Sequence, residues 1–462
     1  NNLYTVDVSV SLDGESTGKT HQFFGGANYD KGSAAASTTW QGRILKTVEI
    51  NDSTANGPVL SDSDWFGWNA ANIGDLDGDG VNDLAVSAWG DDMNASGNAS
   101  GGTIVGAVHI LYMNPDGFVN STVEINDSTT NGPVLTNNAY FGRGVTNIGD
   151  LDGDGVNDLA VGDSRGNSDW KGEMHIMYMN TDGSIDSTVE IGPGTTNGPT
   201  LSNGDLFGTS IANIGDLDGD GVNDIAVGAK QDDEGGANRG AIHIMYMNTD
   251  GSVDSTVEIN DSTTNGPVLS NHDKFGTSIA NIGDLDGDGV NDLIVGAEES
   301  DCVSCSGNNS GSAYIMYMNT DASVKSTVEI NDSTTNGPVI IATDFFGSSV
   351  ANVGDLNGDG VNDIAVGAVK DDGIGTERGV IHIMYMKTDG SIISTVEIND
   401  SDTNGPTLKK LDKFGGSIVN IGDLDGNGID DLVVGANGDD MDASGNTNGG
   451  TNRGALHILF LE

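Results

Sequence analysis

The chain has 462 residues, among them 70 Gly and only 8 Pro, and it carries a formal charge of −52 at pH 7. Its 18 Lys and Arg residues, against 70 Asp and Glu residues, exclude a surface that binds nucleic-acid phosphates. The hydrophobic residues come in short, regular runs rich in Val, Ile and Tyr, which indicates β-strands and argues against disorder. No long segment has the 3.6-residue period of a capped helix, and we expect no membrane-spanning segment.

Six copies of one acidic loop divide the chain into repeats. A Phe-Gly pair precedes each loop and a strand-like stretch such as "DLAVSA" follows it. A variable loop and two further strands, of the "GAVHILYMN" and "STVEI" kind, come next. Each repeat therefore predicts four short antiparallel strands joined by turns. The loops begin at Asp75, Asp150, Asp216, Asp284, Asp355 and Asp423, and the Phe-Gly pairs begin at Phe66, Phe141, Phe207, Phe275, Phe346 and Phe414.

One four-stranded sheet cannot bury both of its faces, whereas radial stacking of similar sheets buries them and leaves only short edges. The sequence therefore predicts an all-β fold, a β-propeller of four-stranded antiparallel blades. The chain ends in a third strand, "GALHILFLE", while a spare fourth strand, "KTVEIND", begins at Lys46. We expect this N-terminal strand to complete the last blade and to close a ring of six blades over residues 44–462.

Residues 1–43 precede these repeats. "VSLDGESTGKT" from Val10 looks like a decayed acidic loop, and "FFGGAN" from Phe23 repeats the Phe-Gly pair. A degenerate first blade, which would give seven blades, is therefore the alternative to an N-terminal arm. "LYTVDVSV" from Leu3 alternates polar and apolar residues like a strand. Because an exposed strand of this kind favours aggregation, we expect it to pair with the ring or with a neighbouring molecule.

The acidic loops carry the residues of an oxygen cage for a metal ion. In the first loop, Asp75, Asp77, Asp79 and Asp83 stand at positions 1, 3, 5 and 9, and the carbonyl of Val81 at position 7 offers a further oxygen. Four carboxylates this close would repel one another without a cation, and hard oxygen ligands suit Ca²⁺ better than Mg²⁺. Position 12 lacks the Glu of a helix–loop–helix calcium site, so we expect a hairpin loop between two strands.

The corresponding positions of all six loops give the predicted ligand set, with about six Ca²⁺ per chain. The predicted metal ligands are Asp75, Asp77, Asp79, Val81 and Asp83; Asp150, Asp152, Asp154, Val156 and Asp158; Asp216, Asp218, Asp220, Val222 and Asp224; Asp284, Asp286, Asp288, Val290 and Asp292; Asp355, Asn357, Asp359, Val361 and Asp363; and Asp423, Asp425, Asn427, Ile429 and Asp431.

The stretch "FGWNAANIGDLDGDGVNDLAVSA" from Phe66 resembles the FG-GAP repeat of the integrin α-subunit propeller and of its secreted bacterial and archaeal relatives. The resemblance covers residues 44–462. It implies that the Asp and Asn side chains at positions 1, 3, 5 and 9 bind Ca²⁺ on one face of the ring. Two features depart from the family: it usually has seven blades, and no inserted metal-dependent adhesion domain is present here.

Other residues compete with the acidic loops as functional candidates. One His recurs in the third strand of five repeats and either lines a ligand site or packs inside the sheet, which is the commoner case. The five Trp are candidates either for ligand stacking near blade one or for core packing. These candidates are His109, His175, His243, His382 and His457, with Tyr314 in the remaining repeat, and Trp40, Trp65, Trp68, Trp89 and Trp170.

Cys302 and Cys305 lack the second Cys pair of a zinc site and the βαβ context of a redox motif, so we expect a local disulfide and an oxidising, extracellular environment. Nine Asn-x-Ser/Thr sequons would carry surface N-glycans in a host with the enzyme. They lie at Asn51, Asn94, Asn98, Asn120, Asn126, Asn260, Asn308, Asn331 and Asn399.

These features predict a secreted or cell-surface, Ca²⁺-stabilised propeller that acts as a non-enzymatic adhesion or ligand-binding protein. Its partner would be a protein or glycan on one face of the ring. The alternative is a structural subunit of an extracellular polymer, filament or coat, in which copies of the chain are linked through the N-terminal strand. No nucleophile–base constellation and no Gly-rich phosphate loop stands out in the sequence, so we expect no enzyme activity.

Overall fold

The computed structural model describes residues 11–12, 15–16, 40, 42–92, 104–166, 169–301, 308–371, 376–440 and 451–462. The chain forms two compact units, Asn1–Thr38 and Thr39–Glu462. In the first unit, β1 (Ser11–Leu12) pairs antiparallel with β2 (Glu15–Ser16). The strand predicted from Leu3 lies outside the described residues.

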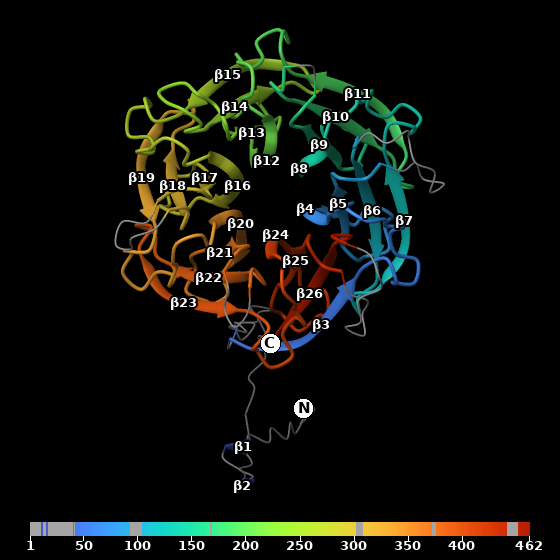
Figure 1. Ribbon diagram of the computed structural model, residues 1–462, viewed down its shortest axis with the longest axis vertical. Helices are drawn as coiled ribbons and strands as arrows, with labels where there is room; N and C mark the ends of the chain where they lie inside the picture. Colours follow the sequence, from blue (N-terminus) through green and yellow to red (C-terminus); the bar gives the residue numbers. More distant parts are fainter. Residues whose placement is uncertain are drawn as a thin grey trace, which may run out of the picture. The chain divides into compact units, whose positions relative to one another are not determined.

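The second unit is a ring of four-stranded antiparallel sheets, which confirms the predicted propeller (Figure 1). Blades one to three contain β4 (Phe66–Gly74), β5 (Asp83–Ala88), β6 (Ala107–Met113) and β7 (Val119–Ile125); β8 (Phe141–Gly149), β9 (Asp158–Asp163), β10 (Glu173–Met179) and β11 (Ile185–Ile191); and β12 (Phe207–Gly215), β13 (Asp224–Ala229), β14 (Ala241–Met247) and β15 (Val253–Ile259). Blades four to six contain β16 (Phe275–Gly283), β17 (Asp292–Ala297), β18 (Ser312–Met318) and β19 (Val324–Ile330); β20 (Phe346–Gly354), β21 (Asp363–Ala368), β22 (Val380–Met386) and β23 (Ile392–Ile398); and β24 (Phe414–Gly422), β25 (Asp431–Ala436), β26 (Ala455–Leu461) and β3 (Ile44–Ile50).

Blade six takes its outer strand from the beginning of the propeller, as predicted. β26 pairs with β3 so that His457 lies opposite Glu49, and β6 pairs with β7 in the same register, with His109 opposite Glu124. Blade six in turn meets blade one, where the amide of Phe66 donates to the carbonyl of Arg453 at 2.9 Å. Among the described residues the ring is therefore complete with six blades, and the alternative of seven is wrong.

The Phe-Gly pairs join neighbouring blades. Each Phe side chain is fully buried, and its amide donates to the carbonyl of the residue just before the Gly that opens the third strand of the preceding blade. A Cβ on Gly240 would lie 2.1 Å from the carbonyl oxygen of Phe275 in the next blade. Only glycine permits this approach, which explains why the third strands begin with Gly-Ala or a similar pair.

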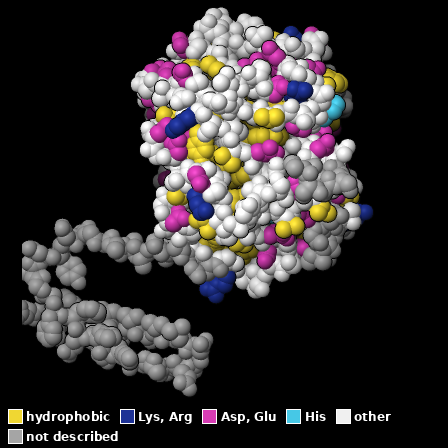
Figure 2. Space-filling view, turned by 90° about the vertical axis from the view of Figure 1, so that its left-hand side faces the viewer, with side chains coloured by type: hydrophobic (Ala, Val, Ile, Leu, Met, Phe, Trp, Pro, Cys, Tyr) yellow, Lys and Arg dark blue, Asp and Glu magenta, His cyan; other side chains and the backbone are white. Residues whose placement is uncertain are grey.

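The hydrophobic core lies between the blades. The residues of one cluster come from blades three and four, for example Ile242, Ile259, Val295 and Met316, and similar clusters fill the other junctions. Figure 2 shows one outer side of the ring, where Asp and Glu side chains are spread with fewer Lys and Arg side chains between them. The acidic composition is thus carried by the surface, while radial stacking buries the strands.

Candidate functional site

The acidic loops connect the first and second strands of the blades, and their carboxylates converge. In loops one to four, an oxygen of each side chain at positions 1, 3 and 9 lies within 4.8 Å of the others. The side chains at position 5 are not part of these groups. The groups that could hold a metal ion include Asp75, Asp77 and Asp83; Asp150, Asp152 and Asp158; Asp216, Asp218 and Asp224; and Asp284, Asp286 and Asp292.

Backbone amides fix the conformation of each loop. The amide of Gly80 donates to Asp75 Oδ2 at 2.9 Å, and the amide of Val81 donates to Asp79 Oδ1 at 2.9 Å. Gly78 and Gly80 have φ values of 80° and 95°, which a residue with a side chain rarely adopts. Loops five and six repeat the first of these bonds, from Gly360 to Asp355 and from Gly428 to Asp423.

The carboxylate at position 9 also anchors the loop to the blade. Asp83 Oδ2 accepts from the amide of Leu76 at 3.0 Å, and Oδ1 accepts from the amide of Met113 in β6 at 2.9 Å. The same pair of bonds occurs in all six loops. Burial raises the pKa of Asp83 to about 6, while these two amides act in the opposite direction. This residue is therefore both a candidate ligand and a structural link.

Loop four differs from the others because a lysine enters it. Lys325 Nζ in β19 lies 2.5 Å from Asp286 Oδ2 and 2.8 Å from Asp288 Oδ2, at loop positions 3 and 5. These two contacts raise the pKa of Lys325 and lower that of Asp288. None of the other blades has a basic side chain at this position. The equivalent residues are Leu45, Asn120, Asp186, Asp254 and Ile393.

Two sets of asparagines, which the sequence analysis did not single out, tie the first five loops to the preceding blade, whereas loop six has Asp430 at position 8. Asn82, at loop position 8, donates to the carbonyl of Ile421 in blade six at 2.8 Å. Asn72, three residues before the loop, donates to the carbonyl of Asn420 at 3.1 Å. Equivalent bonds occur from blade two to one, three to two, four to three and five to four. Their recurrence at fixed offsets was the available sequence signal.

A cavity of about 630 Å³ lies among the first strands of the blades, at the centre of the ring. Most of its lining is small or polar, including Asn, Ser and Thr side chains from several blades. Its charged lining residues are Arg143, Lys230, Lys370, Lys413 and a single carboxylate, Glu298. Lys230 Nζ pairs with Glu298 Oε1 at 3.0 Å. In a chain with a charge of −52, this cavity is therefore locally positive.

Aromatic rings hold these cations in place. The guanidinium carbon of Arg143 lies 4.3 Å from the ring centroid of Trp68 and 4.2 Å from that of Trp89, while Lys413 Nζ lies 4.7 Å from Trp65. Burial lowers the pKa of Arg143 to about 10. Arg143 Nε is buried and has no hydrogen-bond partner among the described residues. We define the cation–aromatic cluster as Arg143, Lys413 and these three Trp.

Six residues that directly precede the Phe-Gly pairs have left-handed backbone conformations, with φ values between 56° and 63°. None is glycine and most are bulky, so each conformation carries strain that the fold must offset. They include aromatic and basic side chains that take part in the contacts described above. These residues are Trp65, Tyr140, Leu206, Lys274, Phe345 and Lys413.

The structure places the remaining Trp elsewhere. Trp40 is buried, and its ring lies 6.5 Å from that of Tyr385 in blade five, so it packs in the core. Trp170 is exposed, with the guanidinium of Arg165 4.7 Å from its ring centroid.

The recurrent His side chains are core residues, as the commoner interpretation predicted. Each is about 1% exposed and lies with its ring 5.5–5.8 Å from the Phe of the Phe-Gly pair in the same blade. Burial lowers the pKa of each of the five to about 4, so they are neutral at pH 7. Tyr314 packs on Phe275 in the same way, at 5.7 Å.

The five Asn-Asp-Ser sequons are turns that pack against the blades. Asn126 is buried, its Oδ1 accepts from the amide of Ser128 at 2.9 Å, and its Nδ2 donates to Glu124. The same two bonds recur at the other four. The nitrogen that a glycan would modify is thus already a donor, and the fold explains this repeat without glycans. Asn94, Asn98, Cys302 and Cys305 lie outside the described residues.

Comparison with known proteins agrees with the predicted resemblance. The FG-GAP repeat model matches residues 207–245, 275–316 and 346–384. Integrin alpha-4 of Xenopus laevis is 34% identical over 167 residues, which are 35% of this chain and 15% of that protein. Integrin alpha pat-2 of Caenorhabditis elegans is 29% identical over 276 residues, which are 56% of this chain and 20% of that protein.

The chain therefore contains FG-GAP repeats arranged as a six-bladed β-propeller, and it is similar to part of the integrin α subunits. It spans a fifth or less of the length of these two relatives. Among the described residues, no helix has the length and the apolar character needed to cross a membrane.

Proposed function

We propose that the chain is a Ca²⁺-stabilised propeller that acts outside the cell or at its surface as a non-enzymatic adhesion or ligand-binding protein. The observation that carries ligand binding is the charge of the central cavity. Its charged lining consists of four cations and one carboxylate in a strongly acidic chain. We therefore propose that the ligand, a protein or a glycan, presents an acidic group to the cation–aromatic cluster of this cavity.

The environment of Arg143 supports an anionic ligand. Trp68 and Trp89 cover the guanidinium, the charge of Glu298 acts on it, and its Nε has no hydrogen-bond partner among the described residues. Hydrogen bonds between a guanidinium and a carboxylate are among the strongest in proteins, and they gain strength where water is excluded. A carboxylate that entered the cavity would thus supply the hydrogen-bond partner that Arg143 Nε lacks.

An array of matched acidic and neutral glycans and peptides tests this proposal. We expect binding to the acidic members only, and at least a roughly tenfold loss with Arg143→Gln, because a charge-assisted bond contributes about 1.5–3 kcal/mol. Lys410→Gln, which removes an exposed cation on the linker before blade six, is the matched control and should leave binding unchanged. Equal binding of neutral and acidic members would contradict an anionic ligand.

For the acidic loops, we propose that each holds one Ca²⁺ through the side chains at positions 1, 3, 5 and 9 and the carbonyl at position 7. The convergence of three carboxylates in loops one to four supports this proposal, and so does the all-oxygen donor set. Metal analysis after dialysis should find about six Ca²⁺ per chain. Two or fewer would refute the ligand set carried over from the integrin α propellers.

A further inference from the structure

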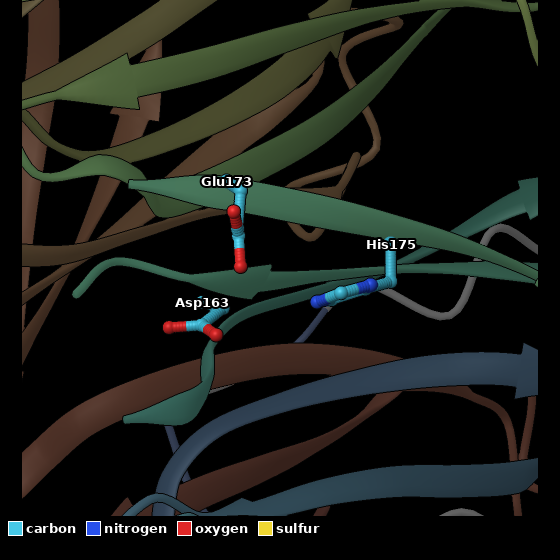
Figure 3. Close-up of side chains that lie close together, drawn as sticks. All are labelled: Asp163, Glu173 and His175. Carbon is cyan, nitrogen blue, oxygen red and sulfur yellow. The ribbon is translucent and has the colours of Figure 1, made fainter. Parts of the chain in front are cut away.

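Blade two contains a group of three buried polar residues, two of which occupy a cross-strand position that carries no charge in the other blades. Asp163 at the end of β9 lies opposite Glu173 at the start of β10. His175, two residues further along β10, directs its ring toward Asp163, as does the carboxylate of Glu173 (Figure 3). At this cross-strand position the other five blades pair small or apolar residues. These pairs are Ala88 and Ala107, Ala229 and Ala241, Ala297 and Ser312, Ala368 and Val380, and Ala436 and Ala455.

The three side chains are removed from water. Asp163 is 0%, His175 1% and Glu173 7% exposed, and one ligand atom of each lies within 4.8 Å of the others. Neither oxygen of Asp163 has a hydrogen-bond partner among the described residues, and neither does His175 Nε2. The backbone amides of Arg165 and Gly166 lie near enough to lower the pKa of Asp163, but they donate to the carbonyls of Ala139 and Asp163. Buried polar atoms without partners are costly, so this group calls for an occupant.

The backbone around the group is adapted to Glu173. A Cβ on Gly192 would lie 2.9 Å from Glu173 Cβ, and a Cβ on Gly166 would lie 2.4 Å from its carboxyl carbon. In the other five blades the position of Gly192 is the Asn of the Asn-Asp-Ser turn, for example Asn126. Blade two therefore differs from the other blades both in this turn and in the cross-strand pair. Two linked differences fit a binding site better than an isolated substitution does.

We propose that Asp163, Glu173 and His175 form a binding site for a divalent transition metal of the Zn²⁺ class. Two carboxylates and an imidazole nitrogen suit Zn²⁺, Mn²⁺ or Fe²⁺, whereas Ca²⁺ takes oxygen ligands only. Two ligand atoms on one tetrahedral Zn²⁺ lie about 3.3 Å apart, so small side-chain rotations would bring this group to coordination distance. The site is separate from the acidic loop of its blade, since β9 spans about 17 Å from Asp158 to Asp163.

The test uses the full chain, stripped with chelator and then saturated with Ca²⁺ so that the acidic loops are filled. Co²⁺ absorption and Zn²⁺ calorimetry then report the additional site. The variant Asp163→Ala/Glu173→Ala restores the pair found in blades one, three and six, and Glu173→Gln keeps the side-chain shape while it removes the charge. We expect one Zn²⁺ equivalent more in the wild-type chain than in the double variant, with affinity reduced at least tenfold by Glu173→Gln.

The two variants also separate a metal from a shared proton. An unchanged Ca²⁺ count in the double variant shows that its fold is retained. Equal Zn²⁺ and Co²⁺ binding by the wild-type chain and both variants would overturn the proposal. It would indicate that Asp163 and Glu173 share a proton instead of binding a metal. The proposal would also be overturned if Glu173→Gln left the Co²⁺ spectrum unchanged, because the proposed site requires carboxylate ligands as well as the imidazole.

Discussion

Lys325 makes the fourth acidic loop different from the others at the scale of one residue. Its ammonium group lies where two loop carboxylates converge, and it must leave before a cation can use them. We predict that Lys325→Asn, which copies Asn120 of blade one, raises the Ca²⁺ affinity of this loop roughly tenfold, because ligand charge sets affinity in such sites. Calcium titration of the wild-type chain and this variant should show one site becoming tighter.

Lys410→Asn removes the same charge from an exposed position and controls for net charge. If both variants change the Ca²⁺ titration equally, the effect is general electrostatics and the specific role of Lys325 is wrong.

The buried His side chains predict a loss of stability in acid. The folded-state pKa of His243 is about 4, below its usual value of 6.5, so the unfolded chain binds more protons between these pH values. Stability therefore falls as the pH drops through this window. His243→Tyr, which copies Tyr314, should remove one such contribution, about 2 kcal/mol of the loss between roughly pH 7.5 and pH 5.

Denaturant unfolding of both chains at each pH measures this difference against a common background of carboxylates. Tyr314→His should add a contribution of the same sign. A wild-type chain and His243→Tyr variant whose stabilities fall in parallel would show that His243 is not neutral in the folded protein.

At the scale of the elements, the contact between blades depends on glycine. Gly240 has a φ of 85°, and a Cβ there would meet the carbonyl oxygen of Phe275. Gly204 has a φ of 92° but open space around it. We predict that Gly240→Ala lowers the free energy of unfolding by roughly 1–3 kcal/mol more than Gly204→Ala, since overpacking adds to backbone strain. Thermal melts of the two variants provide the comparison, and equal losses would contradict a steric role for the blade contact.

The second element-scale prediction separates the two roles of the acidic loop. Among the described residues, the carboxylate of Asp220 at position 5 accepts from the loop amide of Val222, at 2.8 Å. Asp224 at position 9 accepts from Leu217 and from Met247 in β14. We predict that Asp224→Asn destabilises the chain with and without Ca²⁺, whereas Asp220→Asn does so mainly with Ca²⁺ present. Melting curves in Ca²⁺ and in EDTA measure this difference. If position 9 were only a ligand, both variants would lower the melting temperature in Ca²⁺ and neither would lower it in EDTA.

The strands and the repeat could be predicted from the sequence because each blade repeats the same short-range pattern. The "STVEI"-like strand at Lys46 could also be placed, because the last repeat is the one that lacks its fourth strand. The links between blades could not be predicted. The side-chain amide of Asn82 donates to a carbonyl 339 positions away in the chain. Arg143 contacts Trp68 only because blades one and two are adjacent. The group around Asp163 could not be predicted either, because the sequence does not show that Asp163 and Glu173 are paired and buried.

For the whole molecule, removal of Ca²⁺ should lower the melting temperature sharply. Calcium that binds the folded loops and not the unfolded chain stabilises by mass action, by roughly 2.7 kcal/mol per site at a hundredfold excess over Kd. Because asparagines join each of the first five loops to the preceding blade, we expect loss of Ca²⁺ to loosen the blade junctions together. An unchanged melting curve in excess EDTA, with metal loss confirmed, would refute this.

The pairing of β3 with β26 has a consequence for synthesis on the ribosome. Blades one to five each consist of four consecutive strands, so the strands of each blade are all available soon after its own residues emerge, and each blade can pack on the blade before it. Blade six cannot, since its outer strand is made before every other blade and its third strand after all of them. Through most of translation β3 must therefore wait with an unpaired edge, and only the last residues of β26 turn an open arc of blades into a closed ring.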